Sequence, residues 1–110
     1  MSNRVRILVL VLVVAGLVAA PAFSAGKADA GKAVYDKKCA SCHAKDGAGN
    51  PGIAKAMKVE LRHLGSKEVQ AKSDADLKKD IVEGTGKMKA VKLTDAEAAD
   101  VIAFVRTLKK

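Results

Sequence analysis

The chain has 110 residues, a formal net charge of +8, two cysteines and no tryptophan. This length supports a single domain, and the scarcity of aromatic residues argues against a surface that binds nucleic acid by stacking bases. A domain this small with so few large apolar side chains needs further stabilisation, from a disulfide, a metal or another large apolar group.

The first 25 residues are predicted to be a secretory signal peptide. Arg4 and Arg6 precede an unbroken apolar run over 7–20, and small residues follow it. A membrane-spanning helix needs ~20 apolar residues, whereas a basic start, a short apolar middle and a small-residue end are typical of an export signal. We expect cleavage near residues 22–25, which would leave a periplasmic domain of residues 26–110 without a membrane span. An uncleaved signal would instead anchor the protein to the membrane.

The remainder of the sequence predicts an all-α fold of about four helices joined by long loops. The first helix is expected over 28–38, where apolar residues recur at helical spacing. A glycine-rich loop over 46–52 follows, and a short helical segment is expected over 53–59. Residues 60–71 show no regular pattern and are expected to be irregular.

Capping residues predict the start of two further helices. Ser73 with Asp76 indicates an N-cap, and Gly84 is a plausible end for the helix that follows. Thr94 and Glu97 form a capping box before the last helix. Strand-like alternation does not occur. The apolar face of the last helix consists of Ala98, Val101, Ile102, Val105 and Leu108.

Residues 39–43 read Cys-Ala-Ser-Cys-His, which is the attachment signature of a c-type haem. Cysteines three apart on one helical turn face the same side, so both thiols can add to the two vinyl groups at one porphyrin edge. We therefore expect one covalent haem c, bound through Cys39 and Cys42. The next residue, His43, can offer an imidazole nitrogen to the iron. A buried macrocycle would also be the large apolar group that the core lacks.

Three other kinds of site use closely spaced cysteines. A thioredoxin-like dithiol normally follows a strand in an α/β fold, and no strand is predicted here. A disulfide that closes so short a loop removes little chain entropy. A zinc site needs four ligands, and His63 is the only other histidine. The haem interpretation is favoured, and a dithiol oxidoreductase is the next alternative.

The second axial ligand of the iron has three candidates, since methionine and histidine are the usual choices. Met88 lies in a glycine-bearing loop, which can bring its sulfur to the far face of the ring. Met57 is expected to pack on its short helix, and His63 to lie in a surface loop. We favour Met88 and keep the other two as alternatives. If Met88 does not bind, the chain would be an open-site haem protein, such as a small-ligand sensor or a peroxidase-like enzyme.

The motifs together resemble the class I c-type cytochromes, the small, soluble bacterial kind with one haem. The similarity covers the first helix and haem motif over 31–43 and the loop over 46–51. It extends through Gly-Lys-Met at 86–88 to the last helix over 93–105. Lys89 stands where this family commonly has a proline.

This resemblance implies particular contacts. The carbonyl of Pro51 would accept a hydrogen bond from the axial histidine. The first and last helices would cross closely, with Gly31 and Tyr35 on the first helix at the crossing. Val101 and Phe104 would face them from the last helix.

The function that the resemblance implies is electron transport by a monomer that is not an enzyme. A methionine–histidine pair fills both axial positions of the iron, so no substrate would bind there. Removing residues 1–25 takes away two arginines and no acidic residue, which leaves a net charge of +6. Because long-range charge steers encounter, we expect redox partner proteins with acidic docking faces. Nucleic acid is not expected as a partner.

Overall fold

The computed structural model describes residues 26–110, which fold into helices joined by loops. An isolated bridge joins Thr85 and Met88, and no strand occurs in this part of the chain. The all-α prediction is therefore confirmed. The predicted signal peptide over 1–25 lies outside the described residues. The helices are α1 (Ala28–Lys38), α2 (Ala40–His43), α3 (Pro51–Met57), α4 (Lys67–Gln70), α5 (Asp74–Glu83) and α6 (Asp95–Thr107).

The predicted helix ends are present. Ser73 caps α5, since its hydroxyl accepts the amide of Asp76 at 3.1 Å, and α5 ends before Gly84, which has a φ of +82°. Thr94 and Glu97 cap α6 reciprocally, with hydrogen bonds of 3.0 and 3.1 Å. None of the helices in residues 26–110 has the length and apolar character needed to cross a membrane.

Residues 26–110 contain six helices, where the sequence predicted about four. The two additional helices, α2 and α4, have four residues each. A single turn is too short to display a helical period. The region 60–71 was predicted to be irregular, but it contains α4, which Ser66 caps by accepting the amide of Val69 at 3.4 Å. The side chain of Val69 is buried.

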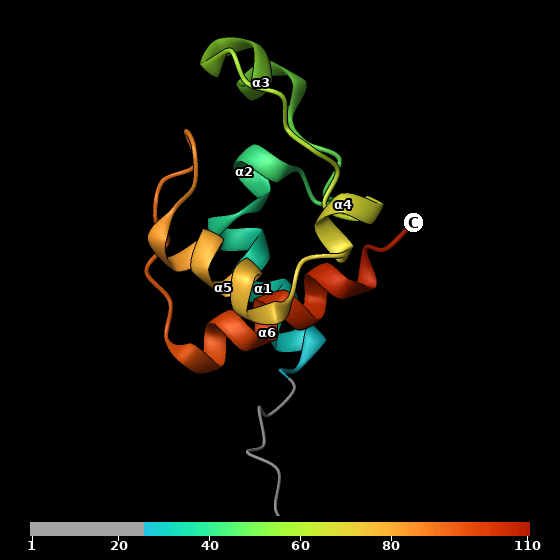
Figure 1. Ribbon diagram of the computed structural model, residues 1–110, viewed down its shortest axis with the longest axis vertical. Helices are drawn as coiled ribbons and strands as arrows, with labels where there is room; N and C mark the ends of the chain where they lie inside the picture. Colours follow the sequence, from blue (N-terminus) through green and yellow to red (C-terminus); the bar gives the residue numbers. More distant parts are fainter. Residues whose placement is uncertain (1–25) are drawn as a thin grey trace, which may run out of the picture.

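The most extensive contact between two of the described helices is the crossing of α1 and α6, at the centre of Figure 1. A side chain at Gly31 would overlap the backbone carbonyl of Asp100 on α6. One turn further along α1, the ring of Tyr35 packs against Phe104, with 4.9 Å between ring centroids. Tyr35 and Val101 are almost completely buried. The expected meeting of the first and last helices is confirmed.

A second buried cluster lies between α6 and the elements α4 and α5. It contains Val69, Leu77 and Ile102. Arg106 of α6 also binds the segment that connects α4 to α5. Its guanidinium donates to the carbonyl of Lys72 and to Asp74 Oδ1, both at 2.7 Å. The last helix thus packs on α1 with one face and on α4 and α5 with another. In contrast, α3 stands apart from the other helices, at the top of Figure 1.

We predict that Gly31→Ala lowers the free energy of unfolding by at least about 2 kcal/mol, because the added methyl group meets backbone that cannot move aside. Urea unfolding of the haem-loaded protein would measure this. Gly52→Ala is the matched control. The nearest atom to its methyl group would be the end of the Asn50 side chain at 3.3 Å, so little change is expected. Equal stabilities of the two variants would contradict the proposed tight crossing.

Candidate functional site

The cysteine–histidine motif forms a tight turn directly after α1. Cys39 separates α1 from α2, and its carbonyl accepts the amides of Cys42 at 3.2 Å and His43 at 3.0 Å. These three residues therefore share one helical turn. The Cys39 side chain is buried and that of Cys42 is half-buried, and both are free thiols. The pair can thus be presented together to one edge of a ligand.

His43 has a half-buried imidazole without a hydrogen bond at Nδ1 to any described residue. Burial lowers the pKa of this side chain and favours the neutral ring. A neutral imidazole is the form that ligates metals, and a buried polar atom without a partner requires an explanation. Pro51, the expected acceptor for this ring, begins α3, but no hydrogen bond joins it to His43 in this structure.

Backbone hydrogen bonds hold the turn against the following loop. The amide of Gly49 donates to the carbonyl of His43, and the amide of Asn50 donates to that of Cys42, both at 2.8 Å. Between these points the chain passes through Ala44, whose φ is 61° and ψ is 164°. This conformation is essentially confined to glycine. The Ala44 carbonyl accepts a hydrogen bond of 2.5 Å from the hydroxyl of Tyr35.

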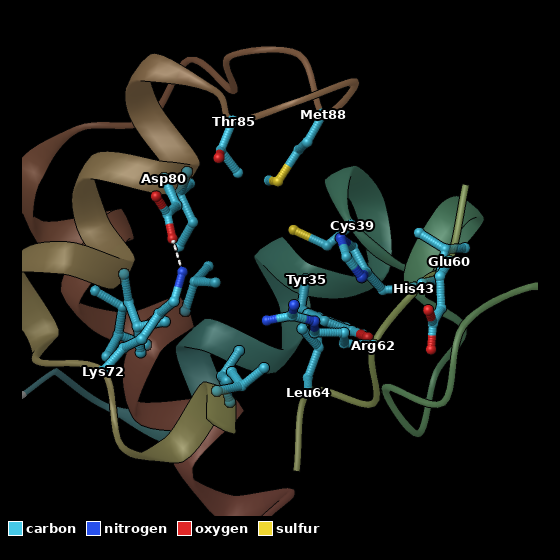
Figure 2. Close-up of a pocket in the computed structure, with 17 residues that line it drawn as sticks. Tyr35, Cys39, His43, Glu60, Arg62, Leu64, Lys72, Asp80, Thr85 and Met88 are labelled. Carbon is cyan, nitrogen blue, oxygen red and sulfur yellow. Dashed lines mark hydrogen bonds and ion pairs between the residues drawn. The ribbon is translucent and has the colours of Figure 1, made fainter. Parts of the chain in front are cut away.

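A cavity of about 880 Å³ opens beside this turn. Its volume lies within the range of roughly 300–1,000 Å³ that is typical of cofactor sites. Cys39, Cys42, His43 and Met88 all line it. A smaller apolar cavity of about 220 Å³ shares several of these residues and extends inwards to Tyr35 and α6. In Figure 2 the sulfur atoms of Cys39 and Met88 point into the same space.

The three candidates for the second axial ligand lie in different places. Met88 lines both cavities, together with Cys39 and His43. Met57 was expected to pack against its own helix, but it is 37 % exposed and lines only the larger cavity. His63 lines neither cavity, and its Nδ1 accepts the amide of Gly65 at 2.9 Å. The geometry favours Met88 among them.

Two contacts that orient the Met88 loop were not foreseen from the sequence. Met88 and Thr85 exchange backbone hydrogen bonds of 2.9 and 3.1 Å, which form a tight turn. The ammonium of Lys87 donates to the carbonyl of Met57 at 2.7 Å and so joins the loop to the end of α3. The glycines at 84 and 86 are a sequence signal from which the turn could have been predicted. Nothing in the sequence indicates the contact with α3.

The electrostatics of the Cys39 thiol differ from those of the nucleophilic thiol in a redox-active dithiol. Burial raises the pKa of the Cys39 thiol and Cys42 raises it further, while Lys38 opposes this change. Reactive dithiols instead have a lowered pKa and an exposed nucleophilic sulfur. Residues 26–110 also contain no group of three or more histidine, cysteine or acidic side chains that could hold a metal ion.

Comparisons with known proteins agree with this geometry. The sequence model of the Cytochrome c family matches residues 28–109. A solved structure described as KustC0563 c-type cytochrome is 31 % identical and superimposes with a TM-score of 0.62. The match covers 73 % of this chain and 98 % of that chain. No curated protein matches the chain.

We predict that Ala44→Gly raises the free energy of unfolding by about 1 kcal/mol, because relief of backbone strain outweighs the added entropy of the unfolded chain. Ala48→Gly is the control in the same loop, where φ is not positive, and it should lower stability. Thermal unfolding of both variants would test this. A loss of stability in Ala44→Gly would show that the Ala44 conformation is not strained.

Proposed function

This chain belongs to the cytochrome c family, whose members carry covalently bound haem c, and we propose that it transfers single electrons between partner proteins in the periplasm. We assign the thioether bonds to Cys39 and Cys42. We assign the axial ligands to His43 and Met88. The observation that carries the proposal is that all four side chains line one cavity of cofactor size.

The residues of the chain have separate roles in this proposal. Bound haem supplies the couple between ferrous and ferric iron. His43 is suited to the iron because burial lowers the pKa of its side chain and so favours the neutral ring that ligates metals. Met88 comes from a loop stabilised by its own turn, and a methionine opposite a histidine raises the reduction potential. If His43 and Met88 both bound the iron, no position would remain open for a substrate, which favours an electron carrier over an enzyme.

We assign the Pro51 carbonyl as the acceptor for Nδ1 of His43. This assignment is supported by two observations. Nδ1 has no other partner among the described residues, and the Asn50–Cys42 hydrogen bond holds the residue before Pro51 against α2. Such a bond would fix the orientation of the ring and increase its basicity.

The partners in this proposal are redox proteins with acidic docking faces. Lys38, Lys87 and Lys89 line the larger cavity, in which the haem would lie. They are among the residues that give the mature chain its net positive charge. Such a field steers encounter and orientation of an acidic partner. We further propose that residues 1–25 are removed on export and that the domain works as a monomer.

The first test is an absorption spectrum of the protein exported by a host that attaches haem c. We expect low-spin bands that remain with the chain on denaturation, because thioether bonds are covalent, and a methionine–iron charge-transfer band in the oxidised form. The mass of the same sample would give the cleavage point. A high-spin spectrum would contradict axial ligation by methionine and favour an open site. Absence of haem would contradict the function as a whole.

Met88→Ala should lower the reduction potential by more than about 100 mV, because axial ligands set haem potentials over a wide range. It should also allow imidazole to bind to the oxidised iron. Potentiometry and an imidazole titration would measure both effects. Met57→Ala is the control, since this methionine lies at the rim of the cavity. If Met57→Ala gave the larger shift, the ligand assignment would be wrong.

A further inference from the structure

The residue after His43 has a backbone conformation that alanine rarely adopts. Ala44 combines a φ of 61° with a ψ of 164°. Residues in this region persist only where the surrounding structure determines them, and they cluster at functional sites. The turn at Ala44 sets the direction in which the chain leaves α2. It therefore also sets the peptide plane next to His43.

Three hydrogen bonds hold Ala44 in this conformation. Its amide donates to the carbonyl of Ala40 at 2.8 Å. Its carbonyl accepts the amide of Gly47 at 3.2 Å and the hydroxyl of Tyr35 at 2.5 Å. The bond from Tyr35 comes from α1, outside the loop, so it joins Ala44 to a different element.

Tyr35 is a rigid donor. Its side chain is fully buried at the crossing of α1 and α6, where its ring packs on Phe104. The surrounding core fixes the ring, and a phenylalanine would fill nearly the same space. Ala44 is the acceptor of the hydroxyl. The hydroxyl thus links the crossing of α1 and α6 to the turn that follows His43.

We propose that Tyr35 is a positioning residue for the axial histidine: its hydroxyl holds Ala44 in the strained conformation and thereby orients the His43 ring toward the haem iron. This inference rests on the proposed function, because it takes His43 as the ligand. Loss of the hydroxyl would leave the Ala44 carbonyl with the hydrogen bond from the Gly47 amide alone. The turn would then relax, and the plane of the imidazole would rotate with it.

The test uses the haem-loaded protein and the substitution Tyr35→Phe. There are two readouts, the reduction potential and the NMR shifts of the haem methyl groups in the oxidised protein. These shifts depend on the orientation of the axial ligands, including the plane of the imidazole. Thr107→Val is the matched control, since it removes a hydroxyl that donates to the carbonyl of Phe104 at 2.6 Å, on the helix next to Tyr35. We expect Tyr35→Phe to change both readouts several times more than Thr107→Val.

The Ala44→Gly background separates positioning from simple loss of stability. Glycine adopts this conformation without strain, so the Tyr35→Phe shifts should fall by roughly half or more in the double variant. Unchanged methyl shifts and potential in Tyr35→Phe would overturn the inference, even if the protein were less stable. Equal shifts in both backgrounds would show that the hydroxyl does not act through Ala44. If the wild-type protein shows no imidazole ligation, it is the proposed function that fails.

Discussion

The contact between α1 and α6 at Gly31 is the constraint on which the site depends. Because a glycine allows the two backbones to approach, the rings of Tyr35 and Phe104 can pack directly above the crossing. That packing fixes the end of α1, and Cys39 follows immediately in the chain. The position of the first thiol, and of the turn that carries His43, is thus set by how closely two helices far apart in the sequence can pack.

The apolar side chains of this chain, few of which are aromatic, are divided between two buried clusters. One buried cluster lies at the crossing, and the other lies between α6 and the segment that contains α4 and α5. The two cavities lie beside these clusters, and the inner one has mainly apolar walls. A covalently bound haem would add the apolar surface that the side chains do not provide, and it would then serve both as cofactor and as part of the core.

Elements with strong local signals could be predicted from the sequence. The apolar period over 28–38, the capping residues of α5 and α6 and the glycine after α5 each depend on neighbouring residues alone, and the structure has them where they were expected. The single-turn helices α2 and α4 were missed because four residues do not display a period. Met57 was wrongly expected to be packed, since the sequence does not show that α3 stands apart from the core.

The sequence by itself determined the class of fold, the attachment motif and the family, because haem attachment requires cysteines and a histidine at one local spacing. Only the tertiary structure decided which side chains face those residues. In the folded chain Met88 lines the cavity, and Lys87 donates a hydrogen bond to the end of α3. The hydroxyl of Tyr35 donates to the carbonyl of Ala44. Such contacts join residues from different elements, so they follow from how closely α1 and α6 pack and from the paths of the loops, which no local pattern encodes.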